Sequence, residues 1–101
     1  MQMEKIFGLQ ACSLDNVATI FGNGVENGST IMITDKAGGC QKITARQAIP
    51  YGHKIAICHI FAGSPVVKYG EAIGLAMSDI KIGDYVHVHN LESQRGRGDW
   101  E

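Results

Sequence analysis

Apolar positions along the chain come in short runs separated by glycine-containing turns, and no segment keeps the 3.6-residue period of an amphipathic helix. Many of these runs are rich in β-branched residues, which favour extended strands. The pattern predicts eight short strands, at residues 6–11, 16–21, 30–34, 41–45, 54–59, 66–68, 72–76 and 85–89. Residues 45–48 are compatible with a short helical turn instead. The predicted class is therefore all-β.

One local pattern occurs three times: an isoleucine, a glycine three positions later in a turn, and an Ile or Val three positions after the glycine as the first inward residue of a strand. The copies occupy residues 49–55, 60–66 and 80–86, and they start 11 and 20 residues apart. That spacing is too irregular for a solenoid, whose repeats keep a fixed period. The pattern predicts one kind of turn reused inside a single small β-domain.

The composition indicates a single folded domain and argues against several classes of function. The chain has 101 residues, of which 45% are hydrophobic, which fits one folded domain and argues against disorder. Nine Lys and Arg against ten Asp and Glu give a net charge of −1, so a broad nucleic-acid surface is not expected. No run approaches the roughly 20 apolar residues of a membrane span, and no secretory signal is recognisable.

The cysteines favour a cytoplasmic protein with reduced thiols. There are three, Cys12, Cys40 and Cys58, at wide spacings and without a C-x-x-C pair. This pattern excludes a zinc knuckle and a thioredoxin-type motif, and an odd number cannot pair fully within one chain.

Residues 85–90, with the sequence YVHVHN, are the strongest chemical feature. Period-two alternation predicts that Val86 and Val88 face the core while His87 and His89 face away from it, roughly 6–7 Å apart along the strand. Two imidazoles at this spacing can share a metal or bracket an anionic substrate, and two solvent-facing strand histidines are the alternative. Zinc takes three or four protein ligands, so a metal here would need further ligands from elsewhere, such as another chain.

Weaker candidates lie before this segment. His53 follows a glycine turn and is a better functional candidate than His59, although both fit the ends of an apolar strand. Lys68 and Glu71 flank the Tyr69-Gly70 turn, where they would either bind a polyhydroxy acid or form a solvated hairpin tip.

Two further segments have simpler interpretations. Arg95 and Arg97 can grip a carboxylate or phosphate from the glycine-rich tail. Asp15 and Asn16 are expected to cap a turn. No catalytic triad pairs a nucleophile with an oriented base.

Five segments in order and spacing resemble a known family. They are residues 15–19 (DNVAT), 49–56 (IPYGHKIA), 65–74 (PVVKYGEAIG), 87–93 (HVHNLES) and 95–99 (RGRGD). Together they resemble the N-terminal SAF domain of the altronate and galactarate dehydratases, a group that includes the small subunit of sulfolactate sulfo-lyase. Residues 22–39 depart from the family, because this glycine-rich stretch is longer than the usual turn.

The resemblance implies a compact SAF domain with a β-clip fold at residues 1–93, followed by a mobile tail at 94–101. It also implies a large catalytic dehydratase subunit as partner and a sugar-acid substrate. The expected reaction is metal-assisted β-elimination of water from D-altronate to 2-keto-3-deoxy-D-gluconate. The metal is expected to be divalent, iron in particular, with the catalytic base and most metal ligands in the large subunit.

In that assembly, His87, His89 and Asn90 are expected to form a wall or lid of the site, with His87 and His89 completing metal coordination. The secondary candidates for substrate contact are His53, Lys68, Glu71, Arg95 and Arg97. Two alternative functions stay open, a sulfolactate sulfo-lyase small subunit and a non-catalytic module that binds sugar acids. Exposed strand edges predict either docking on the large subunit or self-association.

Overall fold

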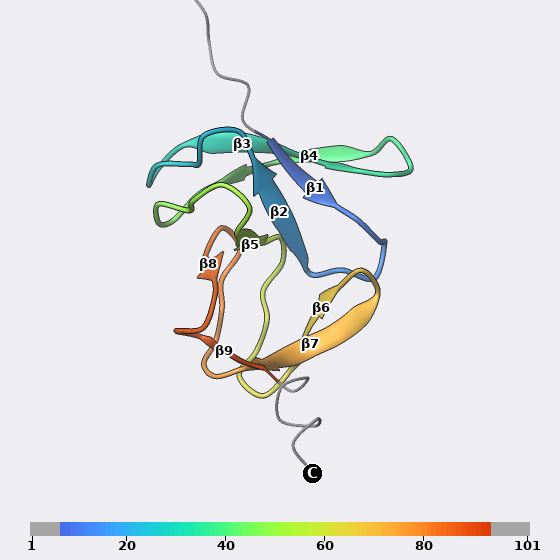
Figure 1. The fold of residues 1–101 in the computed structure, drawn as a ribbon, viewed down its shortest axis with the longest axis vertical. Coiled ribbons are helices and arrows are strands. Elements are labelled where there is room, and N and C mark those ends of the chain that lie inside the picture. Colours follow the sequence, from blue (N-terminus) through green and yellow to red (C-terminus); the bar gives the residue numbers. More distant parts are fainter. Residues whose placement is uncertain (1–6, 94–101) are drawn as a thin grey trace, which may run out of the picture.

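The computed structural model describes residues 7–93, in which all regular structure is β-strand (Figure 1). The strands are β1 (Phe7–Gln10), β2 (Val17–Phe21), β3 (Thr30–Asp35), β4 (Cys40–Thr44), β5 (Lys54–Ala56), β6 (Pro65–Lys68), β7 (Glu71–Ala76), β8 (Tyr85–Val86) and β9 (Leu91–Ser93). The predicted all-β class is confirmed. Nothing helical in this range has the length and apolar character that crossing a membrane requires.

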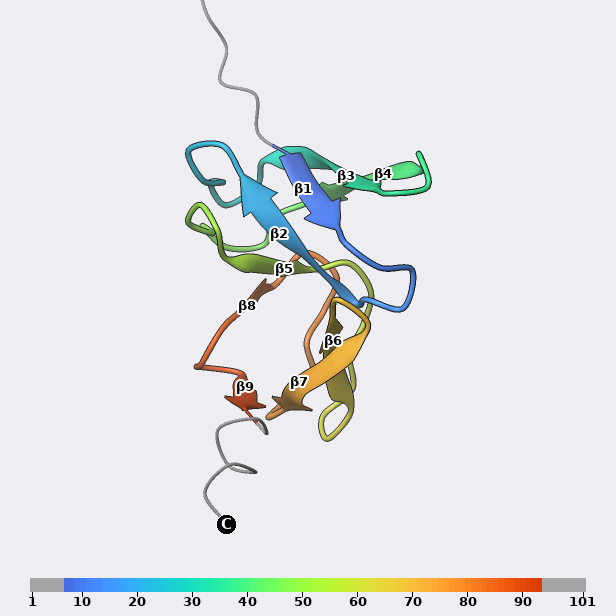
Figure 2. The same cartoon turned by 45° about the vertical axis from the view of Figure 1, so that its right-hand side comes forward.

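The strands form two sheets. The larger has the order β4-β3-β1-β2-β5-β8, and the smaller has the order β6-β7-β9. β1 pairs parallel with β3 and antiparallel with β2. Figures 1 and 2 show the larger sheet curling above the smaller one, with β6 and β7 below the lower end of β2.

Two apolar cores lie on opposite faces of β2 and β5. Successive side chains of a strand point to opposite faces. Ala18 and Ile55, which are register partners, therefore join one core, which we call the first core. Val17 and Ala56, the next pair in the register, join the second core together with Val66 from β6. Burial on both faces explains why β5 has consecutive apolar residues instead of an alternating pattern.

The threefold pattern in the sequence corresponds to one repeated turn. Its three glycines, Gly52, Gly63 and Gly83, have φ of 84°, 84° and 92°, a range that suits glycine. The apolar residues at both ends of each copy are all buried: Ile49, Ile55, Ile60, Val66, Ile80 and Val86. Each copy thus begins with a buried residue, reverses the chain at its glycine and ends with a second buried residue, as predicted.

Asp15 and Asn16 do more than cap a turn. Asp15 Oδ2 accepts the Cys12 N–H at 3.1 Å, which is the predicted local cap. Its other oxygen, Oδ1, accepts the N–H of Gly70 at 2.8 Å, and Asn16 Oδ1 accepts the N–H of Val67 at 2.8 Å. These bonds join the loop after β1 to the β6–β7 hairpin, so they tie the two sheets together.

Three predicted segments differ from the structure. The strand at 85–89 was predicted too long, because β8 ends at Val86 and Val88 is 75% exposed instead of facing the core. The strand at 54–59 likewise ends at Ala56, which leaves His59 in the following loop. Residues 45–48 form a bend and not a helical turn, and β9 was not predicted.

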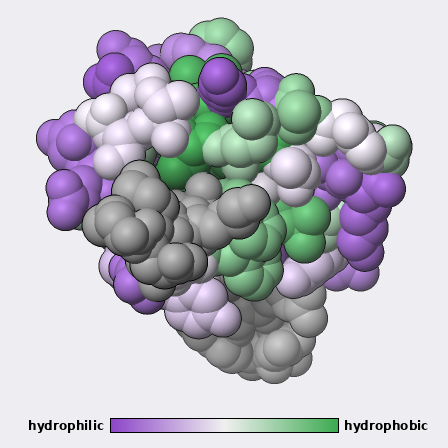
Figure 3. All heavy atoms as spheres, turned by 90° about the horizontal axis from the view of Figure 1, so that it is seen from above, coloured by the Kyte–Doolittle hydropathy of each residue, from purple (hydrophilic) through white to green (hydrophobic). Residues whose placement is uncertain are grey.

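Apolar side chains also gather on the upper end of the larger sheet, which Figure 3 views from above. The Phe7 and Phe21 rings stack with centroids 5.3 Å apart, and the Tyr51 ring meets Phe21 edge-on at 6.1 Å. Tyr51 is exposed. These three aromatic rings pack on the face of β1 and β2 that is opposite the first core.

The β6–β7 hairpin contains a strained residue. Lys68 and Glu71 are register partners, and the two residues between them, Tyr69 and Gly70, have φ of 57° and 76°. Positive φ at both positions is typical of a type I′ turn, which prefers Asn-Gly. Among residues 7–93, Tyr69 is the one residue other than glycine with positive φ, and its side chain is exposed.

We expect Tyr69→Asn to raise the free energy of unfolding by about 1 kcal/mol, because asparagine tolerates the left-handed conformation that costs tyrosine energy. Urea denaturation of the purified chain measures this change. Tyr69→Ala is the matched control, since it removes the ring and keeps the strain, and it should give no gain. An asparagine variant no more stable than the alanine variant would contradict the assignment of strain.

Candidate functional site

The register between β5 and β8 brings two histidines together. Lys54 pairs with Val86 and Ile55 pairs with Tyr85 in an antiparallel arrangement. Continuing this pairing by one residue places His53 opposite His87, and their ring centroids lie 4.6 Å apart. Directly opposite residues of an antiparallel pair have neighbouring side chains. His53 therefore lies beside residues 85–90, the segment that the sequence predicts to be the strongest chemical feature.

Tyr85 completes what we call the histidine–tyrosine cluster, consisting of His53, Tyr85, His87 and His89. The Tyr85 hydroxyl lies 2.6 Å from His53 Nδ1, within hydrogen-bond distance. The Tyr85 ring stacks on His87 at 5.6 Å and is 5.3 Å from the ring of His89. A Tyr85 hydroxyl that donates to Nδ1 leaves the Nε2–H of His53 as a donor for a ligand.

Asn90 holds the turn that carries two of these histidines. Its side chain is buried, its Oδ1 accepts the N–H of His87 at 3.0 Å, and its Nδ2 donates to the carbonyl of Tyr85 at 2.9 Å. Both bonds satisfy the backbone locally, which ends β8 and turns the chain. The amide group of Asn90 is thus engaged by the backbone, and its contribution to the cluster is to position His87.

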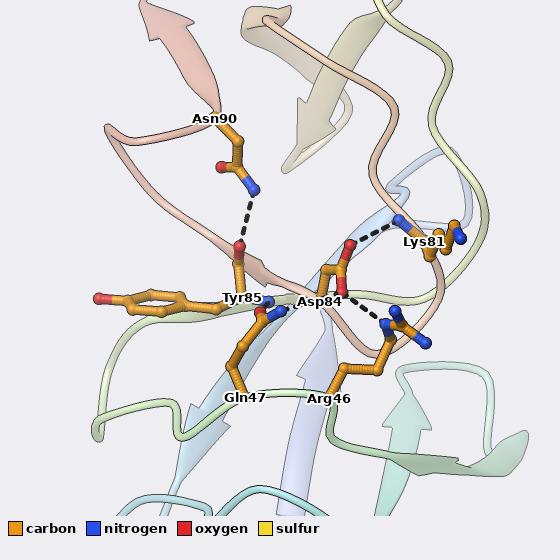
Figure 4. A network of polar contacts seen from close by, with 6 residues as sticks. All are labelled: Arg46, Gln47, Lys81, Asp84, Tyr85 and Asn90. Atoms are coloured by element: carbon orange, nitrogen blue, oxygen red, sulfur yellow. Dashed lines mark hydrogen bonds and ion pairs between the residues drawn. The ribbon is translucent and has the colours of Figure 1, made fainter.

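A second polar network fixes Tyr85 from the other side (Figure 4). Gln47 Oε1 accepts the N–H of Tyr85 at 2.8 Å, and Asp84 forms an ion pair with Arg46 at 2.8 Å. Figure 4 shows the ring of Tyr85 pointing away from these contacts. The backbone of Tyr85 is therefore bonded on both sides, and its ring direction is set by the fold.

Two lysines add positive charge. Lys54, half-buried on β5, has a pKa below its ordinary value because of burial and, to a lesser extent, the charge of Lys68. The pKa of His87 is likewise lowered, first by desolvation and then by the charges of His53, Lys54 and His89. We call Lys54, Lys68 and the three imidazoles the positive neighbourhood because their charges act on one another, although strand alternation puts Lys54 on the sheet face opposite His53 and His87.

Strand pairing places one acidic residue beside this positive neighbourhood, since Glu71 is the register partner of Lys68. The ion pair between Arg46 and Asp84 includes neither Lys54 nor Lys68. The whole chain has a net charge of only −1, so the excess is local. An anionic ligand is the chemistry that such a cluster favours.

The other predicted residues fall in different places. Glu71 lies opposite Lys68 at the start of β7. His59 stacks on Phe61 with centroids 4.3 Å apart, outside the histidine–tyrosine cluster. Arg95 and Arg97 belong to the predicted mobile tail at 94–101, which lies outside the described residues.

Sequence reasoning missed two members of this neighbourhood. Lys54 directly follows His53, but successive residues of an extended strand point to opposite faces, so no sequence signal joined it to the histidines. Tyr85 shares the alternation of His87 and His89, and that pattern alone places it with them.

A complete metal centre does not fit these residues. From Phe7 to Ser93, no three His, Cys, Asp or Glu side chains are grouped so that they can hold a metal ion. His87 and His89 are two imidazoles, fewer than the three or four protein ligands of a zinc site. Their participation in a metal site shared with another chain stays a prediction.

Sequence comparison gives the relatives of the chain. Residues 7–94 match the family described as the altronate/galactarate dehydratase SAF domain. Altronate dehydratase of Escherichia coli (strain K12) is 40% identical over 81 residues, which are 80% of this chain and 15% of that protein. The chain thus spans less than a sixth of this relative's length.

Shorter relatives are covered almost in full. The (2R)-sulfolactate sulfo-lyase subunit alpha of Chromohalobacter salexigens is 35% identical over 83 residues, which are 80% of this chain and 87% of that subunit. The subunit alpha of Paracoccus pantotrophus is 43% identical over 54 residues, which are 54% of this chain and 81% of that subunit.

We expect Asn90→Ala to lower the free energy of unfolding by about 1–3 kcal/mol, because it leaves two backbone groups of the turn without their partner. Denaturant unfolding measures the loss, and the NMR signals of His87 and His89 should shift with it. Asn23→Ala, at an exposed asparagine, is the control and should change stability little. Unchanged stability in Asn90→Ala would contradict the structural role.

The lowered pKa of His87 predicts a pH dependence. A histidine whose native pKa lies below its unfolded value, here 6.5, binds fewer protons when folded, so its contribution destabilises the fold as the pH falls through that range. NMR titration of the ring protons should show that His53→Gln raises the pKa of His87, because it removes a neighbouring charge. Lys42→Gln, at an exposed lysine of β4, should leave it unchanged. Equal pKa values in all three proteins would refute the coupling.

Proposed function

The chain belongs to the altronate/galactarate dehydratase SAF domain family, and from this we propose that it is the SAF component of a lyase that removes water from a sugar acid. A larger catalytic chain completes the enzyme. The relatives support both arrangements of such an assembly, since one is a long dehydratase and two are named as subunits of a sulfo-lyase. In this proposal D-altronate is the substrate and 2-keto-3-deoxy-D-gluconate the product.

The observation that carries the proposal is the positive neighbourhood around the histidine–tyrosine cluster. A sugar acid presents a carboxylate, and removal of the proton beside it places further negative charge on that group. Fixed positive groups and hydrogen-bond donors stabilise charge that develops in a transition state. In this proposal His53 and His87, whose ring centroids lie 4.6 Å apart, receive such a carboxylate.

The elimination itself divides between the two chains. The bond between the α-carbon and its hydrogen breaks, and the proton goes to a base that we assign to the larger chain. The freed electron pair forms the carbon–carbon double bond while the β-hydroxyl leaves and takes up a proton to become water. The resulting enol then becomes the ketone. This chain binds the carboxylate and forms one wall of the site, with His87 and His89 facing the ligand.

We assign the divalent metal expected for the assembled enzyme to the larger chain, because the described residues of this chain do not make a complete centre. Glu71, Arg95 and Arg97 stay secondary candidates for substrate contact. A cytoplasmic location and the role of a separate small subunit belong to the same proposal.

A second candidate function is that of a sulfolactate sulfo-lyase subunit. The observation in its favour is the 35% identity to a subunit alpha of which the chain covers 87%. The elimination is similar, with sulfite as leaving group in place of water. A positive cluster accepts a sulfonate as well as a carboxylate, so the substrate decides between the two. A non-catalytic module that binds sugar acids is the third possibility, and it predicts binding without turnover.

The test begins with affinity purification of the tagged chain from its source cells. The eluate is assayed for keto-acid formation from altronate and galactarate and for sulfite release from sulfolactate. We expect a larger chain to co-purify with water-eliminating activity. Sulfite release alone would favour the second candidate, and a chain that elutes inert and alone would refute a lyase role.

In the active complex, we expect His87→Ala combined with His89→Ala to lower kcat/KM about 10- to 100-fold, because charge-assisted hydrogen bonds to the substrate are lost. His59→Ala is the matched control, since it removes an exposed histidine outside the cluster. Circular dichroism verifies the fold of each variant. Full activity in the folded double variant would refute the assignment of these residues to the site.

A further inference from the structure

We propose that a cavity beside Tyr85 takes the uncharged hydroxyl end of the sugar acid, and that Glu26 in its wall selects acids with one carboxylate over acids with two. The inference rests on the proposed function for the reaction and for the place of the first carboxylate, at His53 and His87. It goes further by assigning a second part of the site and a residue that determines substrate specificity.

The cavity has the size and the lining of a small-molecule site. Its volume is about 480 Å³, within the range of roughly 300–1,000 Å³ that such sites occupy. Its wall includes three polar residues and apolar surface from three others, namely Asn23, Glu26, Ser29, Ile49, Pro50 and Tyr85. A mainly apolar wall with a few polar groups binds the carbon chain and orients its substituents.

Two loops form this wall, one between β2 and β3 and the other between β4 and β5 (Figures 1 and 2). Val25 and Ile49 exchange both backbone hydrogen bonds at 2.8 Å, and their side chains are buried in the first core. The N–H of Ser29 donates to the carbonyl of Glu26 at 3.0 Å. Backbone bonds therefore hold the two loops together, so the wall is in place before a ligand binds.

The cavity adjoins the histidine–tyrosine cluster. Tyr85 belongs to both, because it lines the cavity and its hydroxyl lies 2.6 Å from His53 Nδ1. The carbonyl of Pro50, another wall residue, accepts the N–H of His53 at 3.1 Å within one turn. A ligand whose carboxylate lies at His53 can therefore extend past Tyr85 into the cavity.

The polar part of the wall suits hydroxyl groups. A hydroxyl both donates and accepts hydrogen bonds. The carboxylate of Glu26 accepts them, while the amide of Asn23 and the hydroxyl of Ser29 can do both. Asn23 and Glu26 are exposed and Ser29 is half-buried. A polyhydroxy chain thus finds donors and acceptors at the mouth of the cavity and apolar surface behind them.

Glu26 distinguishes two classes of sugar acid. Altronate has a carboxylate at one end and a hydroxyl group at the other, whereas galactarate has carboxylates at both ends. With the first carboxylate at His53, the second carboxylate of galactarate would approach Glu26, and like charges repel. The hydroxyl end of altronate donates a hydrogen bond to Glu26 instead. The cavity therefore combines an attraction for one acid with a repulsion of the other.

The experiment compares altronate and galactarate as substrates of the active complex. We expect the wild type to have the higher kcat/KM for altronate. Glu26→Gln should raise kcat/KM for galactarate about 5-fold, because it removes the repulsion of two charges across water. It should lower kcat/KM for altronate by less than about 3-fold, because the amide oxygen of glutamine still accepts a hydrogen bond.

Asp79→Asn is the matched control for the change of charge. Asp79 lies outside the cavity wall, and its Oδ1 accepts the N–H of Ala62 at 2.8 Å, a bond that asparagine can keep. This variant should leave both kcat/KM values unchanged.

A second variant, Ala48→Trp, tests the cavity itself. Ala48 lines the cavity and is exposed, so the larger ring narrows the cavity without entering the first core. We expect it to raise KM for altronate about 10-fold and to change kcat less. In NMR spectra of the full chain without its partner, altronate should shift the amide signals of residues 23–29, and Ala48→Trp should abolish these shifts.

The outcomes separate this inference from the proposed function. In an active complex, a preference for galactarate in the wild type, or a preference that Glu26→Gln leaves unchanged, would reject the role of Glu26 and retain the lyase. An unchanged KM in folded Ala48→Trp would reject the cavity. A complex inactive on every acid would reject the lyase, and the NMR titration would then decide the cavity: shifts at residues 23–29 that Ala48→Trp abolishes would retain it, and their absence would reject it.

Discussion

Burial of β5 on both faces is the constraint on which the site depends. Ile55 belongs to one core and Ala56 to the other, so a slip of one residue would exchange their environments and expose apolar surface on both sides. The same register determines which residue of β8 lies opposite each residue of β5. The packing of these two apolar side chains thereby sets the 4.6 Å approach of His53 and His87 and the pairing of Lys54 with Val86.

The hairpin turn holds an arrangement that does not favour stability. Tyr69 takes a backbone conformation that glycine or asparagine would adopt more easily. Local strain of this kind persists when the surrounding structure over-determines it, and it concentrates at functional sites. Here the surrounding structure is the set of bonds from Asp15 and Asn16, which hold the hairpin against the larger sheet.

Structural and ligand-facing residues alternate within the 85–90 segment. Asn90 and the backbone of Tyr85 are engaged in ending β8, whereas the rings of Tyr85, His87 and His89 gather on one side. A ligand would therefore meet imidazoles whose positions are fixed by bonds made elsewhere in the same turn. Such preorganisation lowers the entropic cost of binding.

By itself the sequence determined the all-β class, the three repeated turns and their buried ends, because glycine conformation and apolar spacing are local properties of the chain. It also singled out His53, His87 and His89. Only the tertiary structure decided that β8 stops at Val86, since the side chain of Asn90 competes for the backbone bonds that a longer strand would use. It alone joined His53 to His87, because strand register depends on contacts between distant residues, which periodicity within one segment does not contain.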